Sequence, residues 1–289
     1  MAGWQHYEVT HADVLIAATE LAALIEAGEP VAILDVRWQL TEPDGRAAFA
    51  QGHIPGAVYV SLEDELTDHS VEGRGRHPLP SGRDVEAAAR RWGIRTGVPV
   101  VVYDDWNRAG SARAWWVLTA AGIPGVRILD GGLAAWRGDL ETGTGTAQYG
   151  DVTVPYDDLY AGALPTLTAE QVLTPGLTLL DARAPERFRG DVEPIDPVAG
   201  HIPGALNVPS TSLLDGDGRF LPDAALASAS ADGPIGAYCG SGVTASVVIA
   251  ALAAAGVEAA LYPGSWSEWC SDATHSVSRG SARQPDSTP

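Results

Sequence analysis

An internal repeat constrains this chain more than any other feature of its sequence. Residues 33–37 (Ile-Leu-Asp-Val-Arg) are echoed at 179–183 (Leu-Leu-Asp-Ala-Arg), and Gly-His-Ile-Pro-Gly-Ala stands at both 52–57 and 200–205. The two offsets are 146 and 148 residues, so the halves match almost in register. Two weaker matches follow in the same order: 100–103 with 235–238, and 130–136 with 263–269. Four matches in one order identify a duplicated domain.

Each half alternates short apolar runs with helical stretches. This alternation predicts an α/β fold with a mainly parallel sheet and helices on both of its faces. The helical stretches that show it best are 17–27, 85–92 and 111–121.

Composition along the chain suggests where the two domains begin and end. Residues 141–165 are rich in Gly, Thr and Asp and are predicted to be a linker. It would separate a first domain (1–140) from a second (166–272). Residues 273–289 are mostly small and polar and are predicted to form a flexible tail.

Cys239 lies between an apolar run, 234–238, and an alanine-rich segment, 245–255. The run is typical of a buried strand, and the segment is typical of a helix that ends before Gly256. The cysteine is therefore expected at a strand-to-helix turn, where inward N–H groups and the start of the helix favour the thiolate and make it a nucleophile. The residues expected to form this cradle are Gly240, Gly242, Val243 and Thr244.

The two halves differ at the position where chemistry is expected. Aligning Tyr103 with Tyr238 places Asp104 opposite Cys239, and an aspartate cannot act as a sulfur nucleophile. We therefore expect the second half to be catalytic and the first to be non-catalytic, supplying one wall of a cleft at the domain interface. The candidates for that wall are Trp38, His77 and Trp106.

Composition excludes several other classes of protein. All 18 basic residues are arginine, which removes Schiff-base lysines and lysine phosphate loops. The net charge of -19 provides no basic field for nucleic acid. Two cysteines, Cys239 and Cys270, are too few for a disulfide framework or a cysteine metal site. With no cleavable signal and no apolar run of about 20 residues, we expect a cytoplasmic, soluble protein without membrane contact.

The paired Asp-x-Arg and Gly-His-Ile-Pro-Gly-Ala motifs, with Cys-Gly-Ser-Gly-Val-Thr-Ala in the second half only, resemble the two-domain rhodanese-type sulfurtransferases. The resemblance covers about 15–269. It implies two tandem rhodanese-like domains and a Cys239 persulfide that passes sulfur from a small anionic donor to a thiol, cyanide or thioredoxin-like acceptor. No metal or organic cofactor is implied. The expected donor is 3-mercaptopyruvate, and the alternative is a thiosulfate:cyanide sulfurtransferase.

The resemblance also assigns individual residues. Arg187 matches the arginine that binds the anionic end of the donor, and Asp181 matches an aspartate with an orienting or catalytic role. Ser241 and His77 match the serine and histidine proposed to relay protons in mercaptopyruvate enzymes, and Glu63 stands roughly where their acidic third member would be. Three further residues are expected to have no catalytic role: His53 and His201, which recur in both halves, and Cys270.

One departure from the family pattern concerns the donor. Mercaptopyruvate enzymes usually carry a second arginine about nine residues after the one matched by Arg187, but 195–197 is Ile-Asp-Pro here. Arg189 is the candidate substitute. The neutral pair Gly240 and Ser241 favours mercaptopyruvate, because thiosulfate-preferring relatives often have basic residues there.

Two rivals belong to other classes. A cysteine phosphatase of the related fold would need an arginine six residues after the cysteine, but position 245 is alanine. A non-catalytic binding module remains a description of the first half only, because Cys239 is present in the second.

Overall fold

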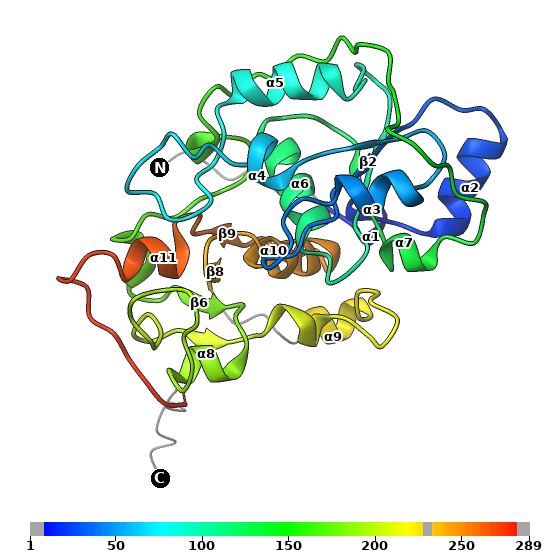
Figure 1. Ribbon diagram of the computed structural model, residues 1–289. Helices are drawn as coiled ribbons and strands as arrows, with labels where there is room; N and C mark the ends of the chain where they lie inside the picture. The colour runs from blue at the N-terminus through cyan, green and yellow to red at the C-terminus, as the bar shows by residue number, and fades with distance from the viewer. Residues whose placement is uncertain (1–8, 228–232, 282–289) are drawn as a thin grey trace.

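The computed structural model describes residues 9–227 and 233–281, which form two domains, each built on a parallel sheet (Figure 1). In the first domain the strand order is β1-β5-β4-β2-β3, and every pairing is parallel. These strands are β1 (Leu15–Ile16), β2 (Ala32–Asp35), β3 (Ala57–Tyr59), β4 (Val100–Tyr103) and β5 (Val126–Leu129).

The second sheet repeats the first in a shorter form, with the order β7-β6-β8-β9 and parallel pairings. Asp35 pairs in register with Tyr103, and Asp181 pairs with Tyr238 in the same way. The duplication seen in the sequence therefore extends to the strand register of the two sheets. In each sheet the two paired strands end together, at the same edge of the sheet. The strands are β6 (Thr178–Asp181), β7 (Leu206–Asn207), β8 (Ile235–Tyr238) and β9 (Ala260–Leu261).

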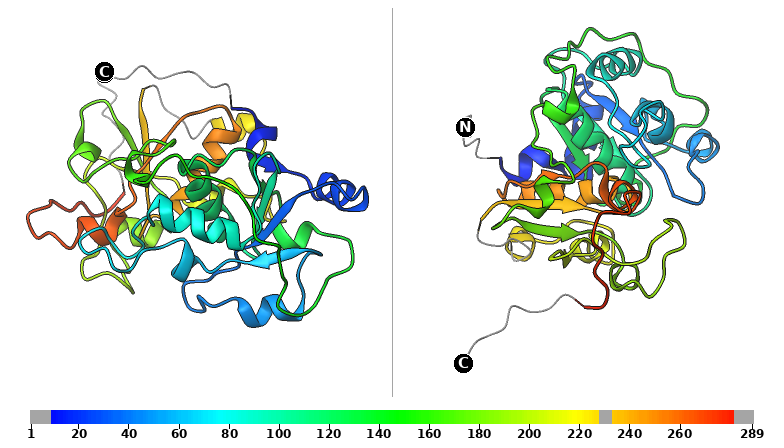
Figure 2. Two further views of the ribbon diagram at one scale, coloured as in Figure 1. Left: turned by 90° about the horizontal axis from the view of Figure 1, so that it is seen from above. Right: turned by 90° about the vertical axis from the view of Figure 1, so that its left-hand side faces the viewer.

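Helices cover both faces of the sheets, which confirms the predicted α/β architecture (Figures 1 and 2). The three predicted helical stretches appear as α2, α5 and α6. The first domain contains α1 (His11–Val14), α2 (Ala18–Glu26), α3 (Arg46–Gln51), α4 (Leu62–Glu65), α5 (Gly82–Arg91), α6 (Ala109–Ala120) and α7 (Gly132–Ala135). Later come α8 (Pro185–Arg189), α9 (Asp223–Ala227), α10 (Ala245–Ala254) and α11 (Ser265–Trp269), with 3-10 turns at Leu159–Ala161, Gln171–Leu173 and Ser210–Leu213.

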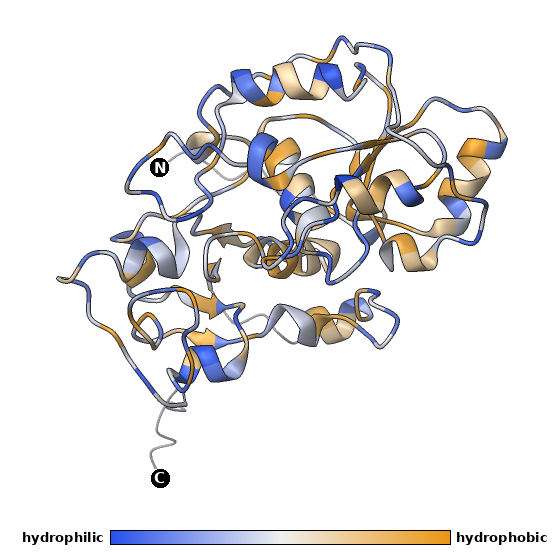
Figure 3. Ribbon diagram, viewed as in Figure 1, coloured by the Kyte–Doolittle hydropathy of each residue, from blue (hydrophilic) through white to orange (hydrophobic). Residues whose placement is uncertain are grey.

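Helix α10 lies at the centre of the molecule and packs against α6 of the other domain. Its residues are buried on nearly all sides and are hydrophobic along the helix, whereas α8 is largely hydrophilic (Figure 3). A helix that is apolar all round needs partners on more than one face. One hydrophobic core accordingly runs from the first domain through α10 into the second, and each sheet has a smaller core on its outer face. The cysteine loop that precedes α10 is thereby held at the domain interface.

The segment between the domains is irregular and lies against the first domain. Gly150 and Ala163 donate backbone hydrogen bonds to Arg90 and Ala120, and Glu141 pairs with His53. These contacts hold the connection to the first domain along much of its length.

The first part of the predicted flexible tail, from residue 273, makes contacts with the second domain. His275 stacks on Trp269 with ring centroids 4.0 Å apart, and Ser278 forms a β-bridge with His201. The segment runs along the outside of the second domain (Figure 2). Its small polar residues suggested fraying, but backbone hydrogen bonds and one aromatic stack hold this part of the chain in place. Residues 282–289 lie outside the described part of the chain. Among the described residues, none of the helices has the length and apolarity required to cross a bilayer.

Candidate active site

Cys239 directly follows β8 and its residue is only 2% exposed. The backbone N–H of Gly242 donates to its Sγ atom at 3.1 Å. Gly242 has a φ of 81°, and a Cβ at this position would stand 2.5 Å from the carbonyl oxygen of Pro263. Only glycine can therefore turn the chain so tightly beneath the sulfur.

The cysteine loop is tied to the start of α11. The Cys239 N–H donates to Ser265 Oγ at 3.1 Å, and the Cys239 carbonyl accepts from the Trp266 N–H at 3.0 Å. Ser265 has a φ of 54°, uncommon for a residue other than glycine, and its hydroxyl also donates to the Tyr262 carbonyl. These hydrogen bonds fix the loop on rigid elements.

The remaining cradle residues have different surroundings. Val243 is 2% exposed and its side chain belongs to the core shared by the two domains. Thr244 is the residue before α10. The N–H that reaches the sulfur is that of Gly242, so Val243 and Thr244 lie where they can orient the loop and start the helix.

A chain of hydrogen bonds crosses the domain interface beside the cysteine. His77 Nδ1 lies 2.7 Å from Ser241 Oγ, and His77 Nε2 lies 3.2 Å from Glu63 Oε1. The same carboxylate oxygen accepts from the Trp38 indole N–H at 2.7 Å, and the Trp38 ring packs edge-on against His77. Serine from the second domain thus meets histidine and glutamate from the first.

The protonation states in this chain follow from the contacts. The hydrogen bond from His77 is the largest of the effects that lower the pKa of Glu63 to about 2, so the carboxylate only accepts hydrogen bonds. His77 Nε2 must then carry a proton, which leaves Nδ1 to accept from the Ser241 hydroxyl. Burial, together with Arg113 and Arg76, lowers the pKa of His77 despite Glu63 and keeps the ring neutral near pH 7. A neutral histidine so oriented can take a proton from serine and return it.

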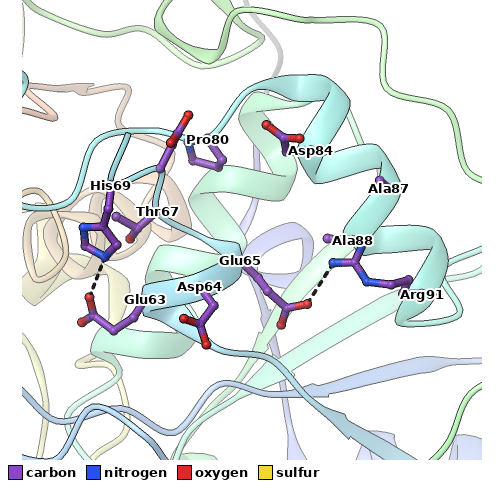
Figure 4. A pocket seen from close by; sticks show the side chains of 11 residues that line it. Glu63, Asp64, Glu65, Thr67, His69, Pro80, Asp84, Ala87, Ala88 and Arg91 are labelled. Carbon is purple, nitrogen blue, oxygen red and sulfur yellow. Dashed lines mark hydrogen bonds and ion pairs between the residues drawn. The ribbon is translucent and has the colours of Figure 1, made fainter. Parts of the chain in front are cut away.

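An open cleft of about 460 Å³ lies on the far side of Glu63, between α4 and α5 (Figure 4). His69 stands at Glu63 with Nε2 3.1 Å from Oε2, and Arg91 pairs with Glu65. Cys239 is not among its lining residues. The cleft therefore exposes the acidic end of the hydrogen-bonded chain, whereas the cysteine lies at its other end.

Two arginines cover the loop beside the cysteine. A Cβ at Gly240 would lie 3.0 Å from Arg76 Nη2 and 3.5 Å from Arg187 Nη1. Arg187 lies in the last turn of α8, where the resemblance implied an anion-binding residue. Arg76 comes from the first domain and was missed, although it immediately precedes His77. The expected substitute, Arg189, pairs instead with Asp191 at the surface at 2.8 Å.

Arg113 is a second cation that the sequence analysis missed. It is fully buried on α6, and its guanidinium donates to the carbonyls of Leu66 and His77, each at 3.0 Å. A weaker contact of 3.5 Å reaches the carbonyl of Gly242 in the cysteine loop. Burial lowers its pKa to about 10, which still leaves the group charged near neutral pH. A lone charge in an otherwise apolar helix was the available signal.

Asp181 does not face the loop as a free carboxylate. It is fully buried and paired with Arg183 Nη2 at 2.7 Å, as Asp35 is with Arg37 in the first domain. Since the pair recurs in the domain without a cysteine, it has a structural role. The contact with Arg183 is compatible with the orienting role expected for Asp181, and direct contact of Asp181 with the donor stays a prediction.

The repeated histidines and the second cysteine are part of the framework. His53 Nδ1 lies 2.9 Å from the Phe49 carbonyl, and His201 Nδ1 lies 2.8 Å from that of Phe188. Each histidine ring also stacks on the ring of the phenylalanine whose carbonyl it contacts. Cys270 is buried in the outer core, and burial raises its thiol pKa. In the described part of the chain, no group of three His, Cys, Asp or Glu side chains is arranged to hold a metal ion.

The matching loop of the first domain is closed by its own side chains. Asp104 accepts from the N–H and hydroxyl of Ser111 at 3.0 and 2.6 Å, and it pairs with Arg108 at 3.0 Å. Arg108, with a φ of 63°, also donates to the Trp106 carbonyl. The loop space that Cys239 occupies in the second domain is taken here by an ion pair. The Trp106 residue is 55% exposed, whereas Trp38 contacts the hydrogen-bonded chain directly.

A duplicated parallel-sheet domain that keeps a cysteine loop only in its second copy defines a class, the two-domain sulfurtransferases. The model of the rhodanese-like domain matches residues 17–139 and again residues 165–272. The chain belongs to the rhodanese-like family, as a sulfurtransferase with two such domains.

Similar proteins carry two kinds of name. A Mycobacterium tuberculosis protein named for thiosulfate sulfurtransferase activity, SseB, is 66% identical over 278 residues, covering 93% of this chain and 98% of the relative. A Pseudomonas aeruginosa protein named for 3-mercaptopyruvate sulfurtransferase activity is 44% identical, covering 92% and 98%. The crystal structure of the Escherichia coli 3-mercaptopyruvate enzyme SseA superposes with a TM-score of 0.75 at 34% identity, covering 88% of this chain and 98% of that one.

Proposed function

We propose that this enzyme takes sulfur from 3-mercaptopyruvate, carries it as a persulfide on Cys239 and passes it to a thiol or to cyanide. The observation that carries the proposal is the Ser241, His77 and Glu63 chain. Removing sulfur from 3-mercaptopyruvate requires a proton to move to carbon, whereas removing it from thiosulfate releases sulfite without a proton transfer. A proton relay at the loop is useful only for the first donor.

In the first step the Cys239 thiolate attacks the donor sulfur. The new S–S bond forms as the donor C–S bond breaks, and the bonding electrons pass to the carbon as the enolate of pyruvate. The donor's thiol proton moves through Ser241 and His77 to that carbon, which leaves pyruvate and the Cys239 persulfide anion. The Gly242 N–H and the buried cation of Arg113 support the negative charge on sulfur.

In the second step an acceptor attacks the outer sulfur of the persulfide. The S–S bond breaks, its electron pair returns to Cys239 as a thiolate, and the acceptor leaves as a persulfide or as thiocyanate. A small thiol, cyanide or a thioredoxin-like protein is a suitable acceptor. Cys239 and Cys270 are both free thiols, and this favours the reducing cytoplasm as the compartment in which the enzyme acts. Cell fractionation would test this location.

The two domains have separate roles in this proposal. Residues 166–272 carry the sulfur, and residues 1–140 are non-catalytic but supply His77, Glu63 and Arg113 to the interface, with 141–165 between them. The ion pair in the loop of the first domain supports this division, because it leaves no group there that could accept sulfur.

The first test compares the two donors with a common acceptor. We expect a kcat/KM for 3-mercaptopyruvate about tenfold or more above that for thiosulfate, since one positioned proton-transfer group contributes about 10² to 10⁴-fold. Steady-state kinetics with cyanide measures both. Equal or better use of thiosulfate would reject the mercaptopyruvate assignment, and the family membership would stand.

The second test replaces Arg187 by lysine. The guanidinium can bind the donor carboxylate through two parallel N–H groups, whereas an ammonium is a point charge. We expect kcat/KM for 3-mercaptopyruvate to fall about 10- to 50-fold, mainly through KM. Arg46→Lys is the control, since Arg46 lies exposed on the first domain and pairs with Asp44 and Asp64. A change below twofold in Arg187→Lys would remove Arg187 from the donor site.

A further inference from the structure

One buried guanidinium contacts the backbone of three separate segments at the domain interface. Arg113 Nη2 donates to the carbonyls of Leu66 and His77, each at 3.0 Å, and its Nε also reaches Leu66 at 3.3 Å. Its Nη1 makes a weaker contact of 3.5 Å with the Gly242 carbonyl. The side chain therefore joins two segments of the first domain to the cysteine loop of the second.

Each of these carbonyls is close in the chain to a member of the hydrogen-bonded relay. Leu66 is the residue directly after α4, and α4 carries Glu63. His77 is itself the central member. Gly242 follows Ser241, and its own N–H is the one that donates to the sulfur of the cysteine. Arg113 thus contacts the three segments on which the relay depends.

Stability alone gives little reason for a charged side chain at this position. Arg113 is 0% exposed and lies within α6, the helix that packs against α10. Its hydrogen-bond acceptors are all backbone carbonyls, and none of the ion pairs in the described part of the chain includes it. A buried cation without a paired carboxylate is costly, and a neutral side chain of similar size would cost less.

The positive charge of Arg113 also acts on the ring of His77. Burial lowers the pKa of His77, Glu63 raises it, and the charges of Arg113 and Arg76 lower it again. A neutral ring is the form that can take a proton from Ser241, so the buried cation favours the working form of the histidine. The other side chains that contact the ring are Trp38 and His69.

We propose that Arg113 is a positioning residue for the proton relay: its guanidinium aligns the segments that carry Glu63, His77 and Ser241, and its charge keeps the histidine neutral. This inference rests on the proposed function and deepens it. A guanidinium holds its N–H groups in one fixed plane and can fix several carbonyls together, whereas the ammonium of lysine is a point charge. The relay is assembled from two domains, so an anchor that contacts both determines whether its members meet.

Two substitutions separate the geometry of Arg113 from its charge. Arg113→Lys keeps the charge and loses the planar group, so kcat with 3-mercaptopyruvate should fall about 10- to 100-fold, with the acid limb of its pH profile unmoved. Arg113→Gln also loses the charge. Its kcat should fall at least as far, and its acid limb should move up by about half a pH unit or more, because the pKa of His77 rises and the ring is protonated at a higher pH.

Thiosulfate provides the internal reference, because its reaction needs no relay. In both variants the loss with thiosulfate should be about tenfold or more smaller than the loss with 3-mercaptopyruvate. Arg90→Gln is the matched control. Arg90 Nε also donates to a backbone carbonyl, that of Val152 at 2.8 Å, but it lies on α5 and pairs with Glu86. It should keep kcat with both donors within about twofold.

The outcomes separate this inference from the proposed function. Each variant is first checked for a wild-type circular dichroism spectrum, and Arg113→Gln, which leaves no buried charge, decides the result if Arg113→Lys does not fold. Equal losses with the two donors, no loss with 3-mercaptopyruvate, or an unmoved acid limb in Arg113→Gln overturns the inference. If mass spectrometry finds no added sulfur on Cys239 of the wild-type enzyme with either donor, the proposed function itself fails.

Discussion

Replacing Cys239 by serine is expected to reduce sulfur transfer to background while the fold persists. The hydroxyl fits the same loop, but an alcohol is too weakly acidic to act as the nucleophile and forms no stable sulfur adduct. The measurement is turnover with both donors, together with the mass of the protein after donor treatment. The wild-type protein should gain one sulfur atom and Cys239→Ser should gain none.

Cys270 provides the matched control for this experiment. It is the other cysteine of the chain and is buried in the outer core of the second domain. Cys270→Ser should keep turnover within about twofold and keep the added sulfur. A thiol-to-hydroxyl substitution in the outer core acts mainly on the stability of the protein. If Cys270→Ser were as inactive as Cys239→Ser, or if Cys239→Ser still transferred sulfur, the persulfide would be assigned to the wrong residue.

Removing the His77 ring should give the second largest loss, but only with one of the donors. His77→Ala should lower kcat with 3-mercaptopyruvate by about 10² to 10⁴-fold, the range typical of a general acid-base group. With thiosulfate, which releases sulfite without a proton transfer, the loss should stay below about threefold. A purely structural role for His77 would affect both donors equally, so the ratio of the two losses is the decisive quantity.

The neighbours of His77 supply the controls. Ser241→Ala should lose about as much as His77→Ala, and the double variant little more, because residues that act as a unit are not additive. Glu63→Gln should lose less, since the amide still holds the ring although it no longer stabilises an imidazolium. A loss below threefold in His77→Ala with 3-mercaptopyruvate would return His77 to a packing role.

The fold was predictable because its signals are local. The repeated Asp-x-Arg motif marks the end of a central strand in each half, and the short apolar runs match β2, β4, β6 and β8. Periodicity and the glycine at the end of α10 can be read in a window of a few residues. The contacts of the tail could not be predicted for the same reason, because small polar residues indicate a local propensity and not the β-bridge between Ser278 and His201.

The site was predictable only in part. Cys239 and its glycines lie in one short segment, and the resemblance supplied Arg187, Ser241 and His77. The sequence did not show that His77 and Ser241 touch, because they are 164 residues apart. Arg76 and Arg113 were missed because an arginine has the same appearance in a sequence whether it is solvated or buried beside a sulfur.

The sequence by itself determined the duplication, the parallel-sheet class and the position of the cysteine that we propose as nucleophile, since each depends on spacing along the chain. Only the tertiary structure decided which groups of the first domain face that nucleophile. Asp181 is paired with Arg183, Arg189 is paired with a surface partner, and Arg76 is a second arginine that lies beside the cysteine loop. The physical reason is that α6 and α10 pack together and bring two distant segments to one loop, and charges act through space and not along the chain.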